Sequence, residues 1–227
     1  MKKLLFYPIL LLFLFSTSCK KETITPNIAD NTSLTMGNPS SATIDFSDSN
    51  NYLLIKHQYA LSYNNSKGEA NWVSWHLSPD WLGSEPRCNC FSPDDSLPAP
   101  FYHVTTSDYT YSGFDRGHQC PSADRDETST DNAATFLMDN MMPQAPNLNE
   151  QTWADFEDYC RTLVNNGNEL CVICGGSGSD EPRHPGGVTE TIDEGTVNVP
   201  THCWKIAVVL PVGDNDVSRI SSFTRII

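Results

Sequence analysis

The pattern of apolar and polar residues predicts a small number of strands. Four runs of strand length are rich in apolar and β-branched side chains: Tyr52–Tyr63, Asn71–Leu77, Leu170–Cys174 and Trp204–Leu210. The polar, glycine-ended stretch Asn64–Gly68 is typical of a turn between the first two runs. Residues 78–113 and the glycine-rich residues 175–187 have no such pattern, and we expect loops there.

One helix is clearly predicted, over Asn149–Asn165. Apolar residues recur there at three- and four-residue spacing, and Gly167 follows as a typical helix end. Asn149, Glu157 and Arg161 are separated by multiples of four residues, so they share one general side of the helix.

The first 48 residues differ in composition from the rest of the chain. Two lysines precede the apolar run Leu4–Phe15, whose twelve residues are too few to span a bilayer of about 30 Å. Small residues and Cys19 follow, which resembles a bacterial lipoprotein signal: residues 1–18 would be removed and Cys19 would carry lipid. Residues 19–48 are polar and are expected to form a flexible tether to a domain at residues 49–227.

This leader predicts an exported, membrane-anchored lipoprotein, periplasmic or on the cell surface, or a secreted protein if Cys19 carries no lipid.

The net charge of the chain limits the kinds of partner that it can bind. There are 14 basic and 28 acidic residues, a net charge of −14, which excludes a uniformly basic nucleic-acid-binding protein but not a locally basic cleft. Between Lys67 and Lys205 every cation is an arginine, the side chain best suited to bidentate oxyanion binding.

Seven cysteines remain after Cys19: Cys88, Cys90, Cys120, Cys160, Cys171, Cys174 and Cys203. Outside the cytoplasm at most three disulfides can form among them, and the sequence leaves the pairing open. A zinc site built from Cys88, Cys90, Cys171 and Cys174 is a weaker alternative. Cys171 and Cys174 are three residues apart in a predicted strand, so they would point to opposite faces.

Two segments concentrate reactive groups. In Asp115-Arg116-Gly117-His118 an extended backbone puts Arg116 and His118 on one face, where a guanidinium can hold a phosphate and an imidazole can accept a proton from water. Asp115 then points the other way, as a structural partner. In the second segment, Asn149 and Glu157 offer oxygen ligands suited to a hard cation such as Mg²⁺.

The combined motif resembles the DNA/RNA non-specific endonucleases of the ββα-metal superfamily. The matching residues are Asp115, Arg116, Gly117, His118, Asn140, Pro143, Gln144, Asn149, Trp153 and Glu157, and the similarity runs from Tyr52 to the end of the chain. It implies an α+β fold with a mostly antiparallel central sheet flanked by helices. It also implies Mg²⁺-dependent cleavage of DNA and RNA without sequence specificity, and no small-molecule cofactor.

The resemblance assigns the central roles. His118 matches the general base, and Asn149 matches the one side chain that holds the catalytic Mg²⁺, for which we expect Mn²⁺ to substitute. Glu157 matches a carboxylate that orients water around the metal. Arg116 matches the arginine of the motif.

Three further residues match positions that contact the substrate or support the catalytic residues. Arg87 and Arg161 correspond to cations that contact or stabilise the phosphate, and Asn140 to an asparagine that supports the histidine or the substrate. The resemblance also implies a further strand and helices after Ile227, so we expect the sequence to lack the end of the domain. The oligomeric state is left open.

Two alternatives remain. The chain could be a non-catalytic, lipid-anchored module that binds nucleic acid or protein, in which case the histidine or the metal-binding asparagine should be missing. It could also be a phosphodiesterase for a small substrate, in which case a closed apolar pocket is expected in place of an open arginine-lined groove.

Overall fold

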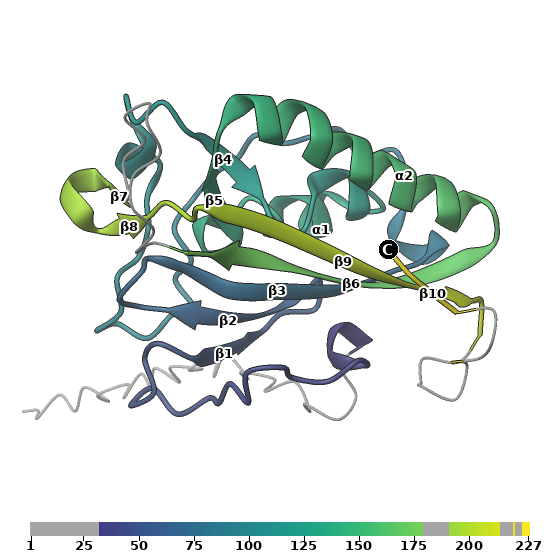
Figure 1. Ribbon diagram of the computed structural model, residues 1–227, viewed down its shortest axis with the longest axis horizontal. Coiled ribbons are helices and arrows are strands. Elements are labelled where there is room, and N and C mark those ends of the chain that lie inside the picture. Colours follow the sequence, from purple (N-terminus) through teal and green to yellow (C-terminus); the bar gives the residue numbers. More distant parts are fainter. Residues whose placement is uncertain (1–31, 179–190, 214–219, 221–223) are drawn as a thin grey trace, which may run out of the picture.

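The computed structural model describes residues 32–178, 191–213, 220 and 224–227. Its largest element is an antiparallel six-stranded sheet in the order β1-β2-β3-β6-β9-β10 (Figure 1). The strands are β1 (Tyr52–Ile55), β2 (Ala60–Asn64), β3 (Glu69–Leu77), β6 (Asn168–Ser177), β9 (His202–Pro211) and β10 (Arg225–Ile226). The expected mostly antiparallel sheet in an α+β fold is confirmed.

Smaller elements complete the described part of the chain. Two two-stranded ladders form, from β4 (Asp115–His118) with β5 (Met141–Gln144) and from β7 (Thr191–Ile192) with β8 (Val197–Asn198). The α-helices are α1 (Ser129–Ala134) and α2 (Ala154–Asn165), and a π-helical segment, Leu148–Trp153, leads directly into α2. Short 3₁₀ turns occur at Thr32–Leu34, Pro79–Trp81, Thr106–Tyr109, Ser122–Asp124, Met138–Asn140 and Asp193–Gly195.

The two faces of the main sheet are covered differently. Helix α2 lies along one face (Figure 1), where its Cys160, Leu163 and Val164 join the main core with side chains of β2, β3, β6 and β9. The other face carries a smaller cluster of Ala42, Leu53 and Trp72, with the N-terminal segment packed against it. Burial of both faces holds α2 and the strands in fixed relative positions, which the functional residues require.

The prediction of a single strand over Tyr52–Tyr63 is wrong. Tyr52–Tyr63 is a hairpin of β1 and β2, with the turn closed by a hydrogen bond of 2.9 Å from the Lys56 N–H to the Tyr59 carbonyl. The polar residues Lys56, His57 and Gln58 interrupt the apolar run and form this turn.

Two predicted irregular segments also differ. Strand β6 continues to Ser177, so the expected loop at residues 175–187 begins later than its glycines suggest, and residues 179–190 lie outside the described part. Within the expected tether, residues from 32 onward pack on the sheet: the Ser33 carbonyl accepts from the Ser74 hydroxyl at 2.7 Å, and Ala42 is buried.

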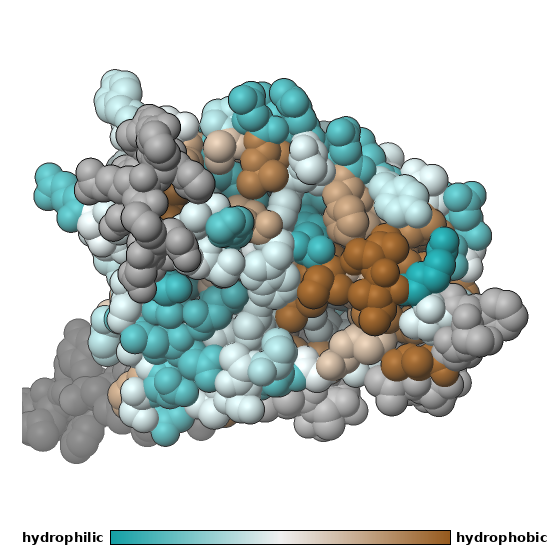
Figure 2. Space-filling view, in the orientation of Figure 1, coloured by the Kyte–Doolittle hydropathy of each residue, from teal (hydrophilic) through white to brown (hydrophobic). Residues whose placement is uncertain are grey.

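The predicted leader and Cys19 lie outside the described residues. Among the helices that the structure describes, none has the length and apolarity needed to cross a membrane. Figure 2 shows apolar side chains gathered over β9 and β10 on the face in view, where Ile206 and Ile226 are exposed.

Of the cysteines that the structure describes, Cys88 and Cys90 form a disulfide. Cys120, Cys160 and Cys174 are buried free thiols, Cys171 is also buried, and Cys203 is half-buried. Within the described residues no group of three or more histidines, cysteines or carboxylates could hold a metal ion, so the zinc alternative finds no support.

Candidate active site

The reactive segments form a ββα unit. Strands β4 and β5 pair in antiparallel register, with Asp115 opposite Gln144 and His118 opposite Met141, and the chain then enters the π-helical segment and α2. The indole N–H of Trp153 donates to the His118 carbonyl at 3.1 Å and ties the start of α2 to the end of β4. The strand and the helix therefore contribute side chains to one place.

That place is a cavity of about 210 Å³. His118 and Asn149 both line it, together with Arg87, Arg116 and Glu157. The structure thus brings five of the seven predicted site residues together from segments that are separate in sequence. A proton acceptor, cations and oxygen ligands around one cavity are what hydrolysis of a phosphodiester needs.

His118 is held as a neutral base. The residue is 8% exposed, and its ring packs edge-on against Phe136, with centroids 4.7 Å apart, and against Phe91 at 5.6 Å. Burial, followed by the positive charges of Arg87 and Lys205, lowers the pKa of His118 to about 3, although a hydrogen bond to the Arg116 main chain acts in the opposite direction. An imidazole in this environment keeps its lone pair at neutral pH.

One ring nitrogen of His118 is buried but makes no hydrogen bond to the described residues. His118 Nε2 has no hydrogen-bond partner among the described residues, whereas the ring does interact with the Arg116 main chain. The main-chain interaction occupies Nδ1 and leaves Nε2 as the atom that can accept a proton. The two phenylalanines and the main chain together fix the orientation of the ring.

Asn149 is oriented by Asp115. Its Nδ2 donates to Asp115 Oδ2 at 3.0 Å, across the junction between the π-helical segment and β4. Because the amide nitrogen is committed to the carboxylate, the amide oxygen is the end that remains for the cavity. The sequence suggested a structural role for Asp115, and the structure identifies its partner as Asn149.

The residues present fit a hard divalent cation. Asn149 Oδ1 makes no hydrogen bond within the described part of the chain, and Glu157 lies on the same cavity wall. One amide oxygen and one carboxylate form an oxygen-only donor set, suited to an ion such as Mg²⁺ that keeps several waters.

Glu157 has a buried partner that sequence reasoning missed. Lys205 Nζ contacts Glu157 Oε1 at 2.6 Å, and their side chains are only 4% and 13% exposed, respectively. The Lys205 ammonium also lies 4.2 Å from the centroid of the Trp153 ring. Burial raises the pKa of Glu157 while Lys205 acts to lower it. A lysine inside the apolar run of β9 was the available signal, since such a residue needs a buried counter-charge.

The π-helical segment explains why Asn149 and Glu157 share a wall. In an ideal α-helix, at about 100° per residue, eight positions would leave the two side chains about 80° apart. The wider π turn advances less per residue and removes part of that difference. Hence the helix interruption aligns the candidate metal ligand with the carboxylate.

Two arginines lie on the cavity wall. The Arg116 guanidinium lies 4.2 Å from the ring centroid of Phe91, and that of Arg87 lies 4.8 Å from the centroid of Phe136. The aromatic rings that flank His118 therefore also support both cations. This places positive charge beside the proton acceptor on an otherwise acidic protein.

The other two predicted site residues do not line the cavity. Arg161 is paired with Asp124 at 2.7 Å and with Asp158 at 2.5 Å. Asn140 is fully buried, and its amide bonds the main chain of Cys120 twice, at 2.9 Å, and the Thr135 carbonyl at 2.8 Å. Of the two roles expected for Asn140, this position suits support of the backbone after His118 and not contact with substrate.

Comparison with known proteins agrees with this geometry. Residues 38–224 match the DNA/RNA non-specific endonuclease family. A protein of Nostoc described as a nuclease is 51% identical over 195 residues, which cover 86% of this chain and 68% of that protein. Human mitochondrial endonuclease G is 32% identical over 171 residues, covering 71% of this chain and 56% of that protein.

A solved structure has the same fold. The crystal structure of the EndoG/EndoGI complex superposes with a TM-score of 0.67 at 26% identity and covers 84% of this chain and 76% of that one. The chain spans between about half and two-thirds of the length of the two nucleases named above. From the ββα unit, the cavity and these matches, we conclude that this chain belongs to the DNA/RNA non-specific endonuclease family.

Proposed function

We propose that this protein is a Mg²⁺-dependent endonuclease that hydrolyses phosphodiester bonds of DNA and RNA without sequence specificity. The observation that carries the proposal is the convergence of neutral His118 and Asn149 on one cavity. Family membership supports phosphodiester hydrolysis. The choice of metal and the breadth of substrate rest on the residues at the site.

The reaction begins with transfer of a proton from the attacking water to His118. His118 Nε2 accepts a proton from the attacking water, and the Phe91 and Phe136 rings hold the imidazole in the orientation that this needs. Arg116 and Arg87 bind the non-bridging oxygens of the phosphate and stabilise the charge that develops there.

Asn149 Oδ1 would hold the cation, and Glu157 would orient water around it. The cation, when bound, supplies neutralisation of the phosphate and of the leaving oxygen. Lys205 pairs with Glu157 within the wall of the cavity and acts against the rise in the pKa of Glu157 that burial causes. Since contacts with phosphate carry no base information, the arrangement suits both DNA and RNA.

The leader supports a location of this activity outside the cytoplasm. We propose export, with Cys19 as the lipidated residue that anchors the protein at a bacterial membrane. Mass spectrometry of the mature N-terminus tests this: an acylated Cys19 is expected, and an unmodified terminus elsewhere would contradict it.

Plasmid nicking tests the activity. With Mg²⁺ the wild-type protein should nick supercoiled DNA and degrade RNA, and a chelator should stop both. His118→Ala should lower the nicking rate by about 10²- to 10⁴-fold, the usual contribution of a general base, and Asn149→Ala should abolish nicking at millimolar Mg²⁺. His57→Ala and Asn166→Ala are matched controls, because both residues are exposed and outside the cavity. Wild-type rates in either site variant would refute the assignment.

The non-catalytic alternative predicts no nicking by the wild-type protein although it binds nucleic acid. It is disfavoured because His118 and Asn149 are both present and adjoin one cavity.

A further inference from the structure

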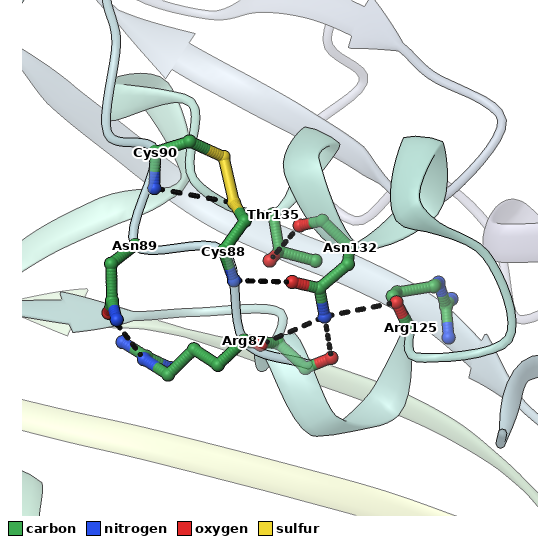
Figure 3. Close-up of a disulfide and its surroundings, with 8 residues drawn as sticks. Arg87, Cys88, Asn89, Cys90, Arg125, Asn132 and Thr135 are labelled. Carbon is green, nitrogen blue, oxygen red and sulfur yellow. Dashed lines mark hydrogen bonds between the residues drawn. A yellow bond between two sulfur atoms is a disulfide. The ribbon is translucent and has the colours of Figure 1, made fainter. Parts of the chain in front are cut away.

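The loop that carries Arg87 contains a disulfide between cysteines separated by one residue. Cys88 and Cys90 are bridged, with Cα atoms 5.2 Å apart, and both residues are exposed (Figure 3). The bridge therefore lies within reach of dissolved thiols and next to a residue of the cavity wall.

The residue enclosed by the bridge contacts Arg87 directly. Asn89 has φ of +51°, in the left-handed region that few residues other than glycine adopt, and asparagine is one of them. In this conformation its Oδ1 accepts the Nε–H of Arg87 at 3.0 Å (Figure 3). The Cys90 N–H also donates to the Cys88 sulfur at 3.3 Å. The bridge thus holds Asn89 in the conformation that reaches Arg87.

Both sides of this short loop are fixed to the domain. The Cys88 N–H donates to Asn132 Oδ1 at 3.1 Å, and the buried Asn132 amide donates to the Ser122 carbonyl at 3.0 Å. On the other side the Ser92 N–H donates to the Phe136 carbonyl at 3.3 Å. Opening of the disulfide would therefore release the conformation around Asn89 while the loop stays attached.

Arg87 keeps its phosphate-binding atoms available. Asn89 occupies Nε, and within the described part of the chain neither terminal nitrogen of the Arg87 guanidinium has a hydrogen-bond partner. The guanidinium rests over the Phe136 ring and lines the cavity beside His118. Two parallel terminal N–H groups can bind two phosphate oxygens, provided that the plane of the guanidinium is fixed.

We propose that the Cys88–Cys90 disulfide and Asn89 form a positioning unit for Arg87, so that reduction of the disulfide weakens binding of nucleic acid while the domain stays folded. This rests on the proposed function. The reductant is a dithiol: the sulfur–sulfur bond takes up two electrons and two protons and gives two cysteine thiols, and the dithiol becomes a disulfide.

Two properties make the effect local. The bridge closes a very short loop, and because the entropic stabilisation by a disulfide grows with the length of the closed loop, its share of global stability is small. The other cysteines that the structure describes are buried or half-buried. Burial raises the pKa of Cys120 and of Cys160 to about 12, so these thiols are unreactive towards alkylation.

The test measures binding separately from cleavage. In the full chain carrying His118→Ala, binding of a fluorescent DNA oligonucleotide with Mg²⁺ is followed by anisotropy, before and after treatment with dithiothreitol and iodoacetamide. We expect the Kd to rise about 3- to 10-fold on reduction, as for loss of one hydrogen bond that positions a charged group. Asn89→Ala should give a similar rise without reductant, and Asn166→Ala should give none.

Two further variants isolate the route through Arg87. The double variant C88S/C90S should bind like the reduced protein and should not respond to dithiothreitol. Arg87→Ala should bind weakly and also should not respond. With His118 present, reduction should raise the KM for plasmid DNA and leave kcat nearly unchanged.

Equal affinity of the oxidised and reduced proteins would overturn the proposal, as would a response to reductant in Arg87→Ala. A melting temperature lowered by more than about 10 °C on reduction would also overturn it, because the bridge would then stabilise the whole domain. Failure of the oxidised wild-type protein to cleave DNA would instead refute the proposed function, and the binding measurements would still stand.

Discussion

The bond between Asn149 and Asp115 predicts that a residue outside the metal ligands controls affinity for the metal. In the wild-type protein Asp115 Oδ2 accepts from Asn149 Nδ2 at 3.0 Å, which leaves Oδ1 for the cation. In Asp115→Asn the new amide can donate to Oδ1 and turn the ligand away. A hydrogen bond to a charged group contributes about 1.5–3 kcal/mol, in line with the 10- to 100-fold, or about 1.4–2.7 kcal/mol, that such partners contribute to metal affinity.

The assay is the rate of plasmid nicking as a function of Mg²⁺ concentration. We expect half-saturation to require about 10- to 100-fold more Mg²⁺ in Asp115→Asn, with a rate at saturation within a few fold of the wild type. Asp95→Asn is the matched control, because Asp95 is exposed and outside the cavity. An unchanged half-saturating concentration in a folded Asp115→Asn protein would refute the proposed orientation of Asn149.

Three other substitutions test the surroundings of the site. Lys205→Met leaves Glu157 buried without its counter-charge and should lower the free energy of unfolding by about 3 kcal/mol, measured with urea at pH 7; a loss below about 1 kcal/mol would count against a buried pair. Asn140→Ala breaks three main-chain hydrogen bonds and should lower the melting temperature by about 6–12 °C in calorimetry. The pKa of His118 is about 3 in the folded protein and near 6.5 when unfolded, so the unfolded chain binds more protons between these values and stability falls as the pH decreases. His118→Gln should therefore gain about 2 kcal/mol relative to the wild type between pH 7 and pH 5, and parallel stability curves for the two proteins would contradict the low pKa.

The residues of the candidate active site could be predicted from the sequence because they lie in short, specific segments. Arg116 and His118 are two positions apart in a strand, and Asn149 and Glu157 occur together on the predicted helix. Local periodicity places Arg116 and His118 on one face of the strand and brings Asn149 and Glu157 to the same general side of the helix. The closer alignment of Asn149 with Glu157 depends on the π-helical turn, which the periodicity does not predict. Four apolar runs of the right length indicated strands of the main sheet, whereas its mostly antiparallel arrangement was implied only by the family resemblance.

The remaining features depend on contacts between distant parts of the chain. Lys205 meets Glu157 across 48 positions, and nothing in the local pattern of β9 specifies that partner. The hydrogen bond from Asn149 to Asp115 spans 34 positions in the same way. Asn140 could be recognised as part of the motif, but whether its amide faces substrate or backbone depends on packing. The packing of Ser33 and Ala42 against the sheet likewise depends on distant contacts, which the polar composition of residues 32–48 does not indicate.

The π-helical segment Leu148–Trp153 limits the insertions and deletions that the candidate active site can tolerate. The Trp153 indole fixes one end of the segment to β4, so an inserted or deleted residue cannot be absorbed by sliding of α2. A change of one residue would instead rotate Asn149 by about 100° around the helix axis. Insertions and deletions within Leu148–Trp153 are therefore excluded. Single substitutions on the side of this turn that faces away from the cavity remain compatible with the proposed activity.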